Sequence, residues 1–275
     1  MIGHDPLTTY KAAVIGAGSG GLTMATGLSN FGHDIVLIEG DKIGGDCTNV
    51  GCIPSKALLH AAEAGVDDPL AWVRARRDGL AADEDVEMET HDHIHLVRGW
   101  ARLTKSENGA HVVCVSGPDG DVEVHAENVI VSTGSKPIEI PVEGLGPERV
   151  LTNENIFEME TVPDTIVLVG GGVISLEMAT AFLDLGSEVH IVELAERLIG
   201  TEDPLVSSTI EAALRDRGAH MHTSTSIERF DEALQTAHLT NGDAIIGVDK
   251  VLIGIGRHPK LAGLGLEDAG VDLAR

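Results

Sequence analysis

The chain has 275 residues, 43% of them hydrophobic, and a net charge of −25 from 44 acidic and 19 basic residues. This length is sufficient for two domains with cores of their own. So acidic a surface argues against nucleic acid and anionic membranes as partners, and no apolar run reaches the roughly 18 residues of a membrane-spanning helix. The N-terminal residues lack the features of a signal peptide, and three cysteines fit a reducing cytoplasm. The lysine-poor balance also favours a halophilic source over an ordinary acidic enzyme.

A dinucleotide-binding βαβ unit is predicted over residues 10–39, where the loop GAGSGG stands between an apolar strand and a helix-like run. In this G-x-G-x-x-G pattern, Gly16 permits a tight turn and Gly18 lets backbone amides approach a pyrophosphate. Gly21 lets the helix pack closely against the strand. The next apolar run ends in Glu39, which is placed to accept hydrogen bonds from a ribose.

The same unit recurs 154 residues further along the chain, with Gly170, Gly172 and Glu193 at the positions of Gly16, Gly18 and Glu39. Ser175 replaces Gly21, which we expect to reduce helix–strand closeness without preventing binding. Two copies predict two dinucleotides, the alternative being two buried βαβ units without ligand. The carboxylate of Glu193 favours NAD over NADP because it binds a 2′-hydroxyl and repels a 2′-phosphate. The nearby Arg197 weakens that preference.

A pair of cysteines, Cys47 and Cys52, stands just before a helix predicted to begin at Pro54. The amides and dipole of a helix N-terminus favour a thiolate and make the sulfur a better nucleophile. Two such sulfurs can cycle between dithiol and disulfide, a two-electron reaction that needs an electron donor. Half a zinc site and two inert core cysteines are the alternatives. A zinc site needs a second ligand pair, and only Cys114 remains, in an apolar run where we expect it reduced and buried.

Two dinucleotide units with a C-x4-C segment between them resemble the pyridine nucleotide–disulfide oxidoreductases, the flavoprotein family that includes dihydrolipoyl dehydrogenase, glutathione reductase and mercuric reductase. Residues 44–56 are similar to the active-site signature of that family. Further similar segments are GWA at 99–101, STGSKP at 132–137 and GIGRHP at 254–259. The resemblance implies an α/β fold of two Rossmann-like, three-layer domains that bind FAD and NAD(P), the second inserted in the first.

The resemblance also implies roles for individual residues. Cys47 is implied to be the thiol that exchanges with substrate, and Cys52 the charge-transfer thiol against the flavin. Lys56 is implied to lie near flavin N5 and to pair with Glu177 beside the nicotinamide, the alternative being two solvated helix charges. The residues implied to bind the two cofactors are Gly16, Gly18, Gly21, Glu39, Gly45, Asp46, Lys56, Ala101, Thr133, Gly134, Ser135, Gly170, Gly172, Ile174, Glu193 and Gly256.

We place the domain boundary in the Pro- and Gly-rich linker 136–147, with an FAD domain at 1–149 and an NAD(P) domain at 150–275. The family's C-terminal interface domain supplies a His-Glu acid/base pair across a homodimer, and no segment after Arg257 matches it. We therefore expect a C-terminally truncated chain that loses flavin easily and has little activity alone. His60 is the next candidate for the acid/base group.

Other segments carry weaker expectations. Residues 97–126 are expected to form antiparallel strands with turns at 107–109 and 117–120, and residues 129–131 a buried parallel strand. The stretch around the acidic run 83–89 looks shorter than in the family, which has long helices there. A helix is expected over 204–217, and strands over 220–222, 236–239 and 250–253. His91, His93 and His95 alternate, but we expect an exposed segment and no metal site.

The sequence thus predicts an FAD-dependent NAD(P)H dithiol–disulfide oxidoreductase, most like dihydrolipoyl dehydrogenase or mercuric reductase. Its substrate would be a small disulfide, a dithiol or a thiol-reactive compound. Dihydrolipoamide fits Glu193 and NAD best, because recognition of mercuric ion relies on C-terminal cysteines that have no counterpart here. The alternatives are a non-catalytic fragment that binds nucleotide only and an NAD-binding module with a redox-sensing disulfide.

Overall fold

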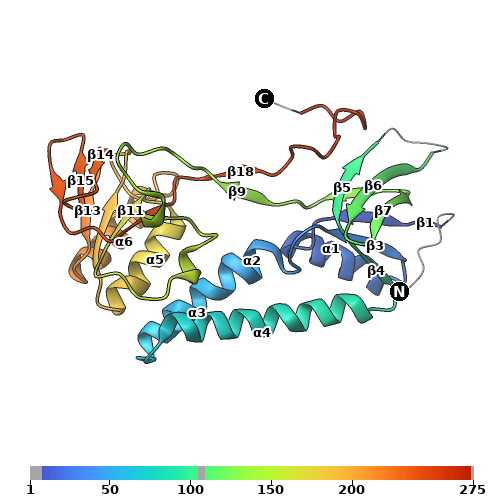
Figure 1. Ribbon diagram of the computed structural model, residues 1–275, viewed down its shortest axis with the longest axis horizontal. Helices are drawn as coiled ribbons and strands as arrows, with labels where there is room; N and C mark the ends of the chain where they lie inside the picture. Colours follow the sequence, from blue (N-terminus) through green and yellow to red (C-terminus); the bar gives the residue numbers. More distant parts are fainter. Residues whose placement is uncertain (1–7, 105–108, 274–275) are drawn as a thin grey trace. The chain divides into compact units, whose positions relative to one another are not determined.

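The computed structural model describes residues 8–104 and 109–273, which divide into two compact α/β units (Figure 1). Unit 1 comprises the described residues within Met1–Asn49, Arg77–Ser135 and Pro259–Arg275, and unit 2 comprises Val50–Arg76 and Lys136–His258. The predicted α/β fold, with the second domain inserted in the first, is confirmed.

The compact units do not coincide with the boundary placed at residue 150. The C-terminal segment returns to unit 1 because Leu264 and Leu266 are buried in the core of that unit. Val50–Arg76 belongs to unit 2 because Leu58 and Leu70 are buried in the core there. The assignment of one domain to FAD and the other to NAD(P) stays a prediction.

Unit 1 is centred on a four-stranded parallel sheet. Its order is β4 (Ile94–Arg98), β3 (Ile35–Glu39), β2 (Ala12–Ile15) and β8 (Val129–Val131). Successive residues of a strand point to opposite faces. Ala12 and Val14 therefore pack with Ala25 of α1 (Ser19–Asn30), whereas Ala13 and Ile15 face a second sheet. That sheet has the order β1 (Thr9–Tyr10), β7 (Gly120–Ala126), β6 (His111–Gly117) and β5 (Trp100–Leu103).

Two expectations for unit 1 are wrong. The strand at 129–131 is parallel but not buried, because β8 is the edge strand of its sheet and Val131 is exposed. Cys114 on β6 is only partly buried. The antiparallel strands of 97–126 are present with their turn at Gly117 and Gly120, while positions 107 and 108 of the other predicted turn lie outside the described residues.

A helix that the sequence analysis did not identify, α4, runs from Pro69 to Thr90. Leu70, Val73 and Met88 are buried at helical spacing along it. Arg77 and Glu84 fall on the same stripe of residues and interrupt its apolar pattern. This interruption of the apolar pattern is the reason that the helix was not identified from the sequence.

Unit 2 has a five-stranded parallel sheet in the order β10 (Val150–Leu151), β17 (Lys250–Ile253), β11 (Thr165–Val169), β12 (Glu188–Val192) and β13 (His220–His222). One face is covered by α3 (Cys52–Glu63), α5 (Val173–Asp184) and α6 (Pro204–Asp216). The other face is covered by an antiparallel sheet of β14 (Ile227–Asp231), β15 (Thr236–Leu239) and β16 (Ala244–Ile245). The strands predicted at 220–222, 236–239 and 250–253 are confirmed.

The chain passes between the units at α2 (Gly45–Val50), within α4, and at β9 (Ser135–Pro137) and β18 (Arg257–Pro259), which pair with each other. Two short 3-10 helices, Pro147–Arg149 and Ile156–Glu158, complete the elements of unit 2. None of the helices in the described residues is both long and apolar enough to cross a membrane.

Candidate dinucleotide and dithiol sites

The glycine loop of unit 1 connects β2 to α1 and leaves no room for a side chain at Gly16 or Gly21. Gly16 has a φ of +98°, and a Cβ there would lie 2.4 Å from the carbonyl oxygen of Ser132. A Cβ at Gly21 would lie 1.7 Å from the carbonyl oxygen of Gly16, so the helix approaches the loop as closely as backbone allows. Gly18 begins α1 and supplies no side-chain cap, which leaves the first-turn amides for a phosphate.

The segment that carries Gly45 and Asp46 lies against this loop. The Gly44 amide donates to the Ala17 carbonyl at 2.8 Å, and a Cβ at Gly45 would lie 2.6 Å from the Cα of Gly18. The loop and this segment therefore form one backbone-lined surface, which fits the pyrophosphate of a dinucleotide. Asp46 lies 4.0 Å from Lys260 Nζ.

Glu39 lies against this loop. Its Oε2 accepts a hydrogen bond from the Ala17 amide at 2.6 Å, and its Oε1 accepts one from the Asp41 amide at 2.8 Å. These bonds fix the carboxylate between the end of β3 and the glycine loop. Such an acid at the end of the second strand is the group that binds a ribose hydroxyl.

Unit 2 repeats this arrangement at the residues 154 positions further on. Glu193 accepts hydrogen bonds from the amides of Gly171 at 2.5 Å and Ala195 at 2.7 Å. Gly170 has a φ of +99°, and a Cβ there would lie 2.6 Å from the Gly254 carbonyl oxygen. The two units therefore share hydrogen bonds and backbone angles at these positions as well as sequence.

The first turn of α5 differs at Ser175, which stands where unit 1 has Gly21. Its side chain is completely buried, and its Oγ has no hydrogen-bond partner within the described ranges. Gly172 begins α5 without a side-chain cap, as Gly18 does for α1, and the neighbouring Ile174 is exposed. The second loop therefore also leaves its first-turn amides without a side-chain cap, and a phosphate can bind to such amides.

Lys56 and Glu177 are brought together within unit 2. Lys56 Nζ lies 2.6 Å from Glu177 Oε1, and the two side chains are 63% and 21% exposed. They stand on α3 and α5, which pack together in the core of unit 2 through residues such as Leu58 and Phe182. Lys56 also donates to Ser55 Oγ at 3.4 Å.

The two cysteines of the C-x4-C segment lie on consecutive helices. Cys47 is in α2 and partly buried, and Cys52 is the first residue of α3 and exposed. The division into units falls between Asn49 and Val50, so each cysteine belongs to a different unit. A disulfide between them stays a prediction.

The remaining predicted residues lie in turns and on strands. Gly134 has a φ of +67° and its carbonyl accepts from the Lys260 amide at 2.9 Å, while Thr133 Oγ1 donates to the Lys260 carbonyl at 2.8 Å. Ser135 begins β9, and Ala101 pairs with Val115. Gly256 has a φ of +129°, and its carbonyl accepts from the Ile138 amide at 3.0 Å.

Two acidic features were missed by sequence reasoning. Glu84 of α4 accepts a hydrogen bond from Thr48 Oγ1 at 3.2 Å, and its Oε2 is buried with no partner in the described part of the chain. A Cβ at Gly44 would lie 2.3 Å from that oxygen, so Glu84 borders the segment that carries Gly45 and Asp46. The second feature is Glu188, on β12 beside two histidines.

The three histidines of the 91–95 strip have separate partners. His91 contacts Ser29 Oγ at 3.4 Å, and His93 contacts Asp34 at 3.0 Å. The ring of His95 packs against Tyr10 instead.

Almost the whole of this chain matches known proteins in both sequence and fold. The family model for pyridine nucleotide-disulphide oxidoreductases matches residues 10–275. Dihydrolipoyl dehydrogenase of Bacillus subtilis is 33% identical over 284 residues, which cover 95% of this chain and 61% of that protein. Dihydrolipoyl dehydrogenase 3 of Haloarcula marismortui is 30% identical over 299 residues, covering 99% and 62%.

Solved structures agree with this match. The HOCl-induced flavoprotein disulfide reductase RclA from Escherichia coli superposes with a TM-score of 0.84 at 29% identity, covering 96% of this chain and 60% of that one. LpdA from Mycobacterium tuberculosis, at 24% identity and a TM-score of 0.84, shares the fold. The chain spans about 61% of the length of the relatives it matches. With its duplicated glycine loops and its C-x4-C segment, the chain belongs to the pyridine nucleotide-disulphide oxidoreductase family, whose members use FAD and NAD(P)H.

Proposed function

We propose that the whole protein is an FAD-dependent NAD(P)H dithiol–disulfide oxidoreductase. The observation that carries this proposal is the duplication in which Glu39 and Glu193 accept hydrogen bonds from equivalent amides beside equivalent glycine loops. Two such loops are typical of a protein that binds two dinucleotides. A pair of cysteines between them needs a two-electron donor.

The net reaction transfers two electrons and a proton from NAD(P)H, with one further proton from solvent, to a disulfide that becomes two thiols. Bound FAD would supply the two-electron chemistry that connects the nicotinamide with the Cys47–Cys52 pair. Cys47 exchanges with the substrate disulfide as its thiolate, and Cys52 then attacks the Cys47 sulfur to release the second substrate thiol. Lys56 supplies positive charge at the flavin, and Glu177 holds that ammonium group in place.

The same geometry favours NAD over NADP. Glu193 stands at the end of β12 with its carboxylate held at the glycine loop, where it binds a 2′-hydroxyl and repels a 2′-phosphate. Arg197 donates to the carbonyls of Gly200 and Glu202 and to Ser207 Oγ. These bonds occupy its guanidinium and so make it less available to a 2′-phosphate.

Our proposals for the substrate, the cellular compartment and the source rest on the relatives and on the composition. Dihydrolipoamide is our first choice of substrate because dihydrolipoyl dehydrogenases are among the relatives, and mercuric ion is the second. We propose a cytoplasmic protein because its three cysteines fit a reducing compartment, and a halophilic source because of its net charge of −25. Homodimerisation, as in full-length members of the family, is proposed for the whole protein only.

The test counts thiols after reduction by nucleotide. The protein is incubated with FAD, oxidised, exposed to NADH or NADPH without oxygen, and alkylated before mass spectrometry. We expect NADH to convert the Cys47–Cys52 disulfide to two alkylated thiols and Cys114 to be alkylated regardless of nucleotide. Cys52→Ser should abolish the nucleotide-dependent change, and Cys114→Ser should not. Binding of NAD without FAD, with thiols unaffected by NADH, would contradict the proposal and favour the redox-sensing module.

A further inference from the structure

The outer edge of the unit 2 sheet carries a cluster of histidines on one face. β13 is the edge strand and pairs in parallel with β12, with His190 directly opposite His220. Because side chains alternate along a strand, Glu188 and His190 share one face of β12, and His220 and His222 share the same face of β13. Four polar side chains therefore meet at the end of an otherwise apolar sheet.

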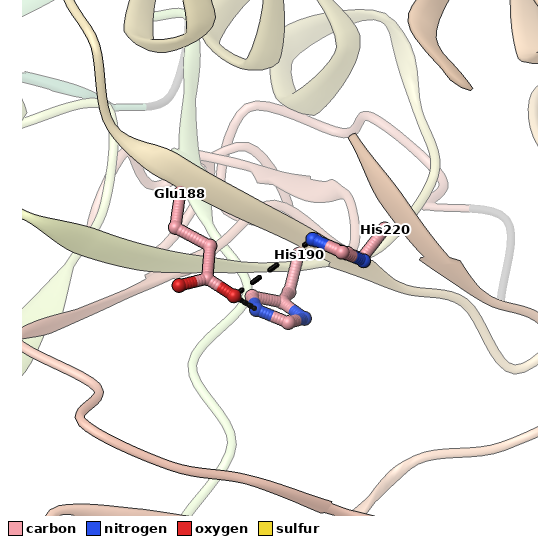
Figure 2. Close-up of side chains that lie close together, drawn as sticks. All are labelled: Glu188, His190 and His220. Atoms are coloured by element: carbon pink, nitrogen blue, oxygen red, sulfur yellow. Dashed lines mark hydrogen bonds and ion pairs between the residues drawn. The ribbon is translucent and has the colours of Figure 1, made fainter. Parts of the chain in front are cut away.

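Three of these side chains, those of Glu188, His190 and His220, point atoms that can bind a metal toward one another, as Figure 2 shows. His190 Nε2 lies 3.1 Å from Glu188 Oε1, and His220 Nε2 lies 3.8 Å from the same oxygen. The three possible ligand atoms all lie within 4.8 Å of one another. In the described part of the chain, this is the one group of three or more such residues with this spacing.

The fourth residue, His222, holds the central ring. His222 Nε2 lies 3.1 Å from His190 Nδ1, on the side of the ring away from Glu188. The ring of His190 stacks with each of the other two, with centroids 4.6 Å from His220 and 5.4 Å from His222. His190 is only 8% exposed, so its ring is fixed by packing as well as by hydrogen bonds.

We propose that Glu188, His190 and His220 bind a divalent transition-metal ion of the zinc type, with His222 as the positioning residue. Tetrahedral zinc with nitrogen and oxygen ligands at about 2.0–2.1 Å places those ligands about 3.3 Å apart, close to the separations seen here. His190 Nδ1–H then donates to His222 Nε2, which is the outer-shell bond that metal-bound histidines usually make.

The site is open rather than closed. The side chains of Glu188 and His220 are each 54% exposed, so a fourth ligand is water or an exchangeable group from solvent. Zinc and imidazole nitrogen are well matched, and the single carboxylate supplies compensating negative charge.

The position is separate from the nucleotide loop. Glu188 begins β12, whereas Glu193 follows its last residue, so the two carboxylates mark opposite ends of one strand. At about 3.3 Å per residue they lie roughly 16 Å apart. Metal binding is therefore expected to leave NAD affinity unchanged, and the inference does not depend on the proposed function.

The experiment measures zinc affinity in a chain without competing thiols. The background variant carries Cys47→Ser, Cys52→Ser and Cys114→Ser, and Zn²⁺ is titrated alone against a chromophoric chelator. We expect one Zn²⁺ per chain at micromolar affinity or tighter. His220→Asn and Glu188→Gln change exposed ligands and should each weaken binding at least about 100-fold, while His222→Ala should weaken it about 10–100-fold.

The matched control is His93→Ala, which removes an exposed histidine that also has a carboxylate neighbour, Asp34. It should leave zinc affinity unchanged. Circular dichroism and thermal melts without metal establish that each variant is folded. Added Zn²⁺ should raise the melting temperature of the background chain but not of His220→Asn. Millimolar binding in the background, or equal affinity in His220→Asn and His93→Ala, would overturn the site.

Discussion

Lys56 Nζ lies 2.6 Å from Glu177 Oε1, although the two residues are 121 positions apart in the chain. The pair joins the helix that begins at Cys52 to the helix that begins beside the second glycine loop. Because Lys56 is mostly exposed, such a pair contributes little to stability. Its position on the two helices that carry the proposed chemistry points to a role in electron transfer.

Glu177→Gln separates these two roles. We expect the free energy of unfolding to change by less than about 1 kcal/mol, because the ion pair is largely solvated. The rate of flavin reduction by NADH should fall about 10²-fold, because the ammonium group of Lys56 loses the carboxylate that positions it. Urea denaturation and stopped-flow absorbance measure the two quantities.

The matched control for Glu177→Gln is Glu211→Gln. Glu211 and Arg215 form an i,i+4 ion pair on α6 with side chains 24% and 51% exposed, similar to the pair at Glu177. This variant should leave the rate of flavin reduction unchanged. Equal rates in the two variants would show that Glu177 is an ordinary surface charge.

Two glycines of α1 should respond oppositely to alanine. A Cβ at Gly21 would lie 1.7 Å from the Gly16 carbonyl oxygen, so Gly21→Ala forces the helix away from the loop. We expect a loss of about 3 kcal/mol or more and loss of FAD binding. Gly27 has no atom within 4 Å of the added Cβ, so Gly27→Ala should stabilise by about 0.5–1 kcal/mol. Thermal melts with and without FAD compare them, and similar melting temperatures would contradict the close approach.

The sequence predicted those features that depend on residues close together in the chain. The glycine loops and their acids were predictable because Gly16, Gly21 and Gly170 leave no room for a Cβ and each acid comes at the end of an apolar strand. The helix α4 was not, because Arg77 and Glu84 occupy positions of its buried stripe. The cluster around His190 depends on the register between two strands 30 residues apart, which neither segment encodes alone.

Glu84→Gln tests how much the buried carboxylate oxygen of Glu84 lowers the free energy of unfolding. Oε2 of Glu84 has no partner in the described part of the chain, and burying such a charged group is unfavourable. The neutral amide should raise the free energy of unfolding by up to about 1 kcal/mol. Glu87→Gln on the exposed face of α4 should change it by less than about 0.5 kcal/mol. If urea denaturation shows that Glu84→Gln destabilises, the carboxylate has a favourable role that its contacts do not indicate.

Nucleotide preference should depend on Glu193 alone among the acids of its loop. Glu193→Arg exchanges a charge that repels a 2′-phosphate for one that attracts it, so the ratio of NADP to NAD affinity should rise at least about tenfold. Glu196→Arg makes the same charge change three residues away on an exposed side chain and should leave the ratio unchanged.

The structure adds a second consequence to this substitution. Glu193→Arg also removes the acceptor of the Gly171 and Ala195 amides, so it should cost about 1–3 kcal/mol of stability in the absence of nucleotide. Glu193→Gln retains an acceptor oxygen and should lose NAD affinity with a smaller cost in stability. Titration calorimetry with NAD and NADP, and urea denaturation of all three variants, distinguish the two effects. A ratio that shifts equally in Glu196→Arg would mean that overall charge, and not the carboxylate at the end of β12, selects the nucleotide.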